Sequence, residues 1–153
     1  MFQGWKFVAL MFAFMLPMAL ANAPALFAQS DNVHKLVIQV SRDDTEGMNL
    51  ALGNAMNYKR YHDQRNEKTQ IEIVAYGPGI TMFREDKSPV KERIAQAMKE
   101  VPNLVLSMCG NAKAAAERRE GHEIIPLAGV GVVPAGIVRV AELQEQGYAY
   151  ARP

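Results

Sequence analysis

The sequence predicts an α/β domain in which helices cover both faces of a mostly parallel sheet of about five strands. Short apolar runs rich in β-branched residues alternate with amphipathic or alanine-rich stretches, and capping or breaker residues stand between them. Strands separated by helices form parallel βαβ units with right-handed crossovers, so we expect a three-layer α/β/α sandwich. The chain has 153 residues, 49% of them hydrophobic, which suits one domain with a packed core.

The front of the chain has the order of a secretory signal peptide. Met1–Lys6 is a polar start with one positive charge, Phe7–Leu20 is apolar, and small residues follow up to Ala28. The apolar run is shorter than the about 20 residues that a membrane-spanning helix needs.

We therefore expect residues 1–28 to be a signal peptide and residues 29–153 to be the mature domain. Cleavage is expected after Ala25 or Ala28, with Ala28 preferred, because Pro24 makes a cut after Ala23 a poor one. The processed protein would lie in the periplasm without a stable membrane span. An uncleaved N-terminal anchor is the alternative.

The mature chain begins with a strand–helix–strand pattern. Lys35–Ser41 is a buried strand, and Asp44 or Thr45 supplies the N-cap of the helix that follows. Glu46–His62 carries apolar residues at helical spacing. Gln70–Tyr76 is the second strand.

A loop and a second helix come next. Gly77-Pro78-Gly79 is a breaker cluster that predicts a loop. Ser88 stands as a capping hydroxyl before Pro89 at the first helical position. The helix over Val90–Val101 has an amphipathic stripe, and Pro102 ends it.

The third strand, Asn103–Met108, leads directly to the single cysteine of the chain. Cys109 is thus expected at the carboxyl end of a strand. Gly110-Asn111 turns the chain into an alanine-rich helix, Ala112–Glu120, which Gly121 closes. The sequence therefore places Cys109 at the start of a helix.

The remaining segments predict two short strands, a helix and an edge strand. Glu123–Leu127 and Gly129–Val133 are the short strand candidates. Pro134 opens the last helix, which Gly147 ends. Tyr148–Arg152 alternates like an edge strand.

Cys109 is the strongest candidate for a reactive residue. Ligands of open α/β sheets gather outside the carboxyl ends of the strands, and free N–H groups at a helix start favour a thiolate. Such a cysteine suits covalent thiol or persulfide chemistry. A free cysteine that ends an apolar strand is also often only packed in the core, so this alternative stays open.

The other polar groups give weaker signals. Gly77-Pro78-Gly79 could wrap a small anion or form a plain sharp turn, and it lacks the spacings of nucleotide-binding loops. Asp43-Asp44 could act as acid and base or only cap the first helix. Arg118-Arg119 stands too far along its helix to activate Cys109 and suits a solvated face.

Composition and spacing argue against metal and nucleic-acid sites. His34, His62 and His122 are scattered over different expected segments and form no His-x-x-x-His pair, so no metal site is expected. One cysteine excludes a disulfide framework. The chain has 17 Lys and Arg against 16 Asp and Glu, and Lys6 is the only charged residue before Gln29. A neutral mature domain offers no basic field for DNA or RNA.

Several segments resemble the DsrE/DsrF-like family, in particular its exported members. The most specific is the strand–cysteine–helix block from Leu104 through Cys109 to Gly121. The other similar segments are Lys35–Ser41, Asn49–Asn57, Ile73–Gly79, Val133–Ile137 and Leu143–Tyr150.

This resemblance implies a flavodoxin-like fold that assembles into homotrimers or homohexamers. In the sulfur-relay branch of the family, the cysteine matching Cys109 carries sulfur as a persulfide and passes it to a partner protein. The resemblance implies no metal and no organic cofactor. A sulfur donor, and an acceptor protein or small sulfur compound, would be the partners.

Three functional hypotheses follow. The first is a periplasmic sulfur carrier or sulfurtransferase in which Cys109 accepts sulfane sulfur, Gly110 and Asn111 stabilise charge, and Tyr76 with Gly77–Gly79 forms the adjacent wall. The second is a non-catalytic module that binds a small ligand or assembles, with Cys109 structural. The third is a thiol-based redox or copper-related accessory protein with Met108 and Cys109 as the soft-ligand pair.

Overall fold

The computed structural model describes residues 33–153, so the signal peptide predicted for residues 1–28 lies outside the described part. None of the helices in this part has the length and apolarity needed to cross a membrane. The elements in chain order are β1 Val33–Val40, α1 Thr45–Asp63, β2 Lys68–Ala75, the 3₁₀ helix η1 Gly77–Phe83, α2 Lys91–Glu100, β3 Leu104–Cys109, α3 Gly110–Glu120, β4 Val130–Val133, α4 Gly136–Glu145 and β5 Ala149–Ala151.

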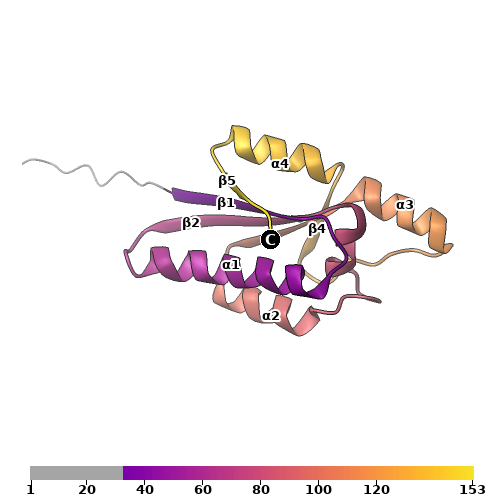
Figure 1. Cartoon of the computed structure of the whole chain (residues 1–153), viewed down its shortest axis with the longest axis horizontal. Coiled ribbons are helices and arrows are strands. Elements are labelled where there is room, and N and C mark those ends of the chain that lie inside the picture. The colour runs from indigo at the N-terminus through magenta and orange to yellow at the C-terminus, as the bar shows by residue number, and fades with distance from the viewer. Residues whose placement is uncertain (1–32) are drawn as a thin grey trace, which may run out of the picture.

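The five strands form one parallel sheet in the order β4-β3-β2-β1-β5. Helices α1 and α2 lie on one side of the sheet and α4 on the other (Figure 1). The chain crosses from β1 to β4 in one direction and returns to the far side of β1 for β5. Right-handed crossovers put the helix of the return step on the opposite face. The expected three-layer, flavodoxin-like sandwich is confirmed.

The central strands are buried on both faces, as the nearly continuous apolar runs predicted. The larger core cluster joins the sheet to α1 and α2, and it includes Ile38, Leu52 and Ile94. A smaller cluster joins the other face of the sheet to α4 and consists of Val37, Val74, Val140 and Leu143. The sheet is therefore fixed from both sides.

A buried ion pair fastens α4 to the middle of the sheet. Glu72 on β2 is only 2% exposed. It accepts hydrogen bonds from Nε and Nη2 of Arg139 on α4, at 2.9 and 2.8 Å, and from Ser107 Oγ on β3 at 2.7 Å. The hydrogen bond from Arg139 to Glu72 raises the pKa of Arg139. Burial of a carboxylate at this depth is costly, and these hydrogen bonds offset the cost.

Most predicted elements are present, with shifts of one or two residues at their ends. Asp44 is the N-cap of α1, and its Oδ1 accepts the N–H of Gly47 at 2.7 Å. Gly121 ends α3 with a φ of +76°, the left-handed conformation that favours glycine at this position. Residues 149–151 form an edge strand beside β1.

The strand predicted at Glu123–Leu127 is absent. This segment makes only one isolated bridge, between Arg84 and Pro126. Its backbone groups bond outside the sheet instead: Ile124 N–H donates to Glu117 Oε1 at 2.9 Å, and Leu127 N–H donates to Phe83 O at 2.8 Å. The apolar pattern reflected the buried Ile124 side chain in a connecting segment.

Two predicted details between β2 and α2 differ from the structure. The residues after Tyr76 form the 3₁₀ helix η1 instead of an open loop. Ser88 does not cap a helix that starts at Pro89: its hydroxyl donates to Met82 O at 2.5 Å and accepts from Val90 N–H at 3.4 Å, and α2 begins at Lys91. Ser88 therefore joins the end of η1 to the start of α2.

Candidate functional site

Cys109 is the last residue of β3 and the N-cap of α3. Its Sγ accepts the N–H of Ala112 at 3.5 Å, within range for sulfur. The first turn of α3 contains no acidic side chain. The sulfur thus lies where the free N–H groups and the positive end of the helix dipole stabilise negative charge.

A second helix also begins beside Cys109. Gly136 is the first residue of α4, and a Cβ added there would lie 3.1 Å from the Cβ of Cys109 and 2.7 Å from the Cβ of Tyr76. Only glycine therefore allows α4 to start this close to both residues. Sequence reasoning did not nominate Gly136, because nothing in its local pattern shows that the start of α4 meets the end of β3.

The thiol is largely covered, since Cys109 is only 6% exposed in the single chain. Such burial fits a packed cysteine, and it also fits a thiol shielded from unwanted oxidants. Met108 is fully buried in the core cluster. Successive side chains of a strand point to opposite faces, which disfavours Met108 and Cys109 as the soft-ligand pair of the copper hypothesis.

The two residues after Cys109 make backbone contacts away from the sulfur. Asn111 N–H donates to Pro134 O at 3.2 Å, so the backbone amide that reaches Sγ is that of Ala112. A Cβ on Gly110 would lie 3.2 Å from Val133 O. The Asn111 hydrogen bond thus ties the start of α3 to the connection between β4 and α4, and the absence of a side chain at Gly110 lets the two segments approach closely.

Tyr76 stands next to Gly136 and is partly buried. Burial raises the pKa of its phenol, and the nearby Tyr150 raises it further. Tyr150 in turn donates a hydrogen bond to Gln39 Oε1 at 2.7 Å. The nominated wall beside Cys109 therefore continues onto β1 and β5.

The glycines after Tyr76 allow a backbone conformation and a close backbone approach that a side chain would disfavour. Gly77 has a φ of +52°, and a Cβ on Gly79 would lie 2.4 Å from Val40 O. Gly77 and Pro78 also line a hollow of about 380 Å³ between η1 and α3. Ala112 lies in the wall of this hollow, whereas Cys109 does not.

The charged side chains of this hollow are mostly paired. Arg84, 3% exposed, donates to both oxygens of Glu120 at 2.8 Å and to Asp86, and Lys87 donates to Glu120 at 2.7 Å. These hydrogen bonds hold the pKa of Glu120 well below its usual range and raise the pKa of Arg84. Arg118 and Arg119 are both exposed, as expected for a solvated face, and Arg119 also lines the hollow.

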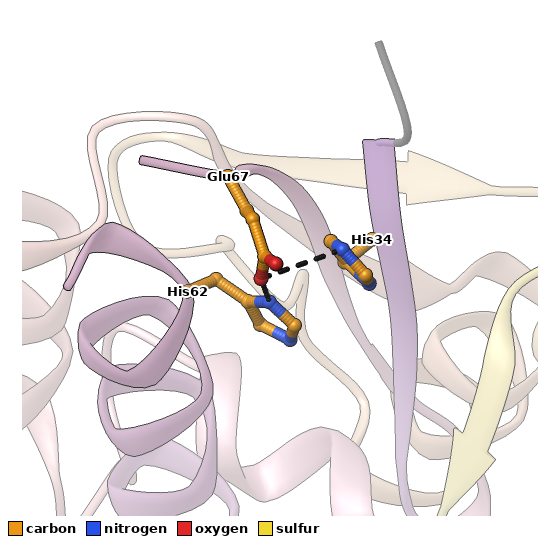
Figure 2. A group of neighbouring side chains, drawn as sticks. All are labelled: His34, His62 and Glu67. Carbon is orange, nitrogen blue, oxygen red and sulfur yellow. Dashed lines mark hydrogen bonds and ion pairs between the residues drawn. The ribbon is translucent and has the colours of Figure 1, made fainter. Parts of the chain in front are cut away.

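A second polar cluster lies at the opposite edge of the sheet. His62 Nδ1 is 2.6 Å from Glu67 Oε2, and His34 Nε2 is 3.5 Å from the same oxygen (Figure 2). The two imidazole rings stack with centroids 4.0 Å apart. The expectation of scattered histidines is wrong for this pair.

The βαβ unit explains why these residues meet. His34 is at the start of β1, and Glu67 directly precedes the neighbouring parallel strand β2. Helix α1 connects the two strands and runs back along them. His62, one residue before its last residue, therefore lies beside the starts of both strands. The third histidine, His122, lies elsewhere, with its Nε2 3.5 Å from Glu120.

Comparisons with known proteins agree with the fold. A model of the DsrE/DsrF-like family matches residues 34–151. A solved structure of MTH1491, a protein of unknown function from Methanobacterium thermoautotrophicum, is similar with a TM-score of 0.62 and 25% sequence identity. The match covers 78% of this chain and 99% of that one. A search of the curated proteins finds no match.

Proposed function

The chain belongs to the DsrE/DsrF-like family, and on that basis we propose that it handles sulfur through Cys109. In this proposal Cys109 accepts sulfane sulfur as a persulfide and passes it to another molecule. Family membership suggests a sulfur relay at the level of the family, and the geometry around Cys109 supports its assignment as the carrier.

The transfer is a pair of exchange reactions at sulfur. The Cys109 thiolate attacks the terminal sulfur of a persulfide or polysulfide donor, a new bond forms between Sγ and that sulfur, and the donor leaves as a thiolate. An acceptor thiolate then attacks the outer sulfur, and Cys109 leaves as a thiolate. No electrons are gained or lost overall, so neither step requires a cofactor.

The observation that carries the proposal is the position of Sγ at the start of α3, beside the start of α4. Ala112 N–H already points at the sulfur, and neither helix has an acidic side chain in its first turn. Both the thiolate and the persulfide are anions, and partial positive charge at a helix start stabilises them. A plain packing cysteine has no need of this arrangement.

The supporting residues position the sulfur. Asn111 bonds the start of α3 to the connection that leads into α4, and Gly110 lets this connection come close. Tyr76, on the other side of Gly136, would limit the approach of donor and acceptor. Gly77 and Gly79 set the path of η1, which walls the neighbouring hollow.

We further propose that the protein is exported to the periplasm, as expected from residues 1–28, and assembles into a homotrimer or homohexamer. Ile137 and Val138, both more than half exposed, adjoin Gly136 and would suit a subunit contact close to Cys109. The partners would be a sulfur donor and an acceptor protein or small sulfur compound.

The 6% exposure of Cys109 favours one alternative, a small-ligand-binding or assembly module in which the cysteine is structural. The hollow between η1 and α3 would then be the binding site, since it has a volume of about 380 Å³. Alkylation separates the two functions, because a structural thiol reacts only after unfolding.

The test is intact-mass spectrometry of the purified protein after incubation with polysulfide. We expect the mass of one or more sulfur atoms to be gained, removed again by a thiol reductant, and not gained by Cys109→Ser. His34→Asn, at the opposite edge of the sheet, is the matched control and should load like the wild type. No adduct, with a thiol that resists alkylation until urea unfolds the protein, would support the alternative.

A further inference from the structure

We propose that His34, His62 and Glu67 form a binding site for one divalent transition-metal ion of the zinc type. The site lies at the amino edge of the sheet, whereas Cys109 lies at the carboxyl edge. It is therefore independent of the proposed sulfur chemistry.

The three side chains converge on one point. Nδ1 of His62 and Nε2 of His34 both face Glu67 Oε2, at 2.6 and 3.5 Å (Figure 2). All three potential ligand atoms lie within 4.8 Å of one another. Two imidazoles and one carboxylate are a donor set that zinc commonly takes, with a fourth position left for water.

The site is largely formed in advance. The His34 and His62 rings stack with an interplanar angle of 21°, and Tyr58 packs against His62 with centroids 4.5 Å apart. The turn between the ligands is closed by the backbone, since Glu67 N–H and Arg65 N–H both donate to His62 O, at 3.0 and 2.9 Å. An ion would therefore meet two of its ligands already fixed by α1 and the turn after it.

The spacing of the cluster also suits a metal. His62 Nδ1 and Glu67 Oε2 are 2.6 Å apart. A metal ion would take the place of this direct contact, and the separation would open to the roughly 3.3 Å set by two tetrahedral zinc bonds.

Access and neighbouring charges permit binding. The side chains of His34 and Glu67 are 36% and 35% exposed, so solvent reaches the open side of the cluster. Two cations of this region have partners outside the cluster: Lys59 pairs with Asp63, and the Arg65 guanidinium lies over the Tyr61 ring at 3.6 Å.

A second group of possible ligands, Asp86, Glu120 and His122, makes a weaker candidate. Both oxygens of Glu120 already accept hydrogen bonds from the buried Arg84. A metal ion there would have to break this bidentate pair with a buried guanidinium, whereas in the first cluster it replaces only the contact between His62 and Glu67.

The test is a zinc titration of the untagged protein against a chromogenic chelator, with Co²⁺ absorption as a report of tetrahedral geometry. We expect one Zn²⁺ per chain. His34→Asn and Glu67→Gln should each weaken affinity by more than about tenfold, a loss that even outer-shell partners of metal ligands produce. Both substitutions are at partly exposed side chains, and circular dichroism checks that the variants stay folded.

Two controls make the assignment specific. His122→Asn removes a histidine outside the cluster, and Cys109→Ser removes the thiol, so both should bind zinc like the wild type. Equal binding by His34→Asn, Glu67→Gln and the wild type would overturn the proposal. Loss of binding only in Cys109→Ser would also overturn it, because the ion would then belong to the carboxyl edge.

Discussion

The two edges of the sheet carry polar sites of opposite construction. At the carboxyl edge, one buried side chain, Cys109, is surrounded by backbone groups at the starts of α3 and α4. At the amino edge, three side chains from β1, α1 and the start of β2 meet one another directly. The backbone makes the first site, whereas the side chains make the second.

This difference has a consequence for chemistry. A helix start stabilises an anion such as a thiolate or a persulfide, because N–H groups point toward it. Stacked imidazoles with a carboxylate bind a proton or a metal cation instead. Under the two proposals, one α/β domain stabilises an anion at one end of its strands and binds a cation at the other.

The largest effect on stability is expected in the middle of the sheet, between the two sites. Arg139→Ala would leave the Glu72 carboxylate, 2% exposed, without its main partner. We expect a loss of about 3 kcal/mol in the free energy of unfolding, measured in urea. Glu142→Ala is the control: it removes only the exposed contact with Arg139 at 3.7 Å and should cost less than about 0.5 kcal/mol. Equal losses in both variants would contradict the role of Glu72.

The next largest effect is expected at Gly136, and it should change the Cys109 site without changing the histidine cluster. Gly136→Ala introduces a Cβ 2.7 Å from that of Tyr76, so α4 or Tyr76 must shift. We expect about 2 kcal/mol of destabilisation and slower sulfur loading of Cys109, with zinc affinity unchanged. Gly53→Ala is the control. Its new Cβ would meet only Arg93 Nη2, at 3.8 Å, so the substitution should stabilise the helix by about 0.5–1 kcal/mol. A stable, fast-loading Gly136→Ala variant would show that the close approach is not needed.

A smaller effect is expected at the turn that carries Glu67. Asn66 has a φ of +55°, a conformation that asparagine and glycine adopt more readily than alanine. Asn66→Ala should cost about 1 kcal/mol and weaken zinc binding, while sulfur loading stays unchanged. Asn66→Gly serves as the control, since it should keep zinc affinity. If both variants bind zinc equally well, the turn does not position Glu67.

The smallest effect is expected from pH, because it is confined to acid pH, below the ordinary pKa of a glutamate. Hydrogen bonds from Arg84 and Lys87 hold the pKa of Glu120 below its value in the unfolded chain, about 4.3. The folded state therefore binds this proton less readily, so the pair's contribution is present above that value and is lost as pH falls below it. Thermal unfolding of Glu120→Gln should depend less on pH below about 4 than that of the wild type. The exposed Glu145→Gln is the control and should follow the wild type.

The carboxyl edge could be predicted from the sequence because its signals are local. The apolar strand leads directly to Cys109, Gly110 and an alanine-rich helix. A few neighbouring residues therefore predict that Cys109 is the N-cap of this helix. The same holds for Asp44 as the cap of α1. The contribution of Gly136 was not predictable, because its contact with Cys109 depends on how α4 returns across the sheet.

Two local sequence patterns led to wrong predictions, because buried residues there are not part of the predicted strand or helix. The apolar residues of Glu123–Leu127 suggested a strand, but Ile124 is buried as part of a connecting segment. Ser88 before Pro89 resembles a helix cap, but its hydroxyl joins η1 to α2.

The sequence by itself determined the order of strands and helices, the parallel α/β class and the place of Cys109 at the end of a strand. These follow from hydrophobic periodicity and from caps, which act between residues close in the chain. Only the tertiary structure decided that His34, His62 and Glu67 meet, that Arg84 holds Glu120, and that Arg139 reaches Glu72. Those contacts depend on which strands are neighbours and where each helix ends, and no local pattern in the chain specifies either.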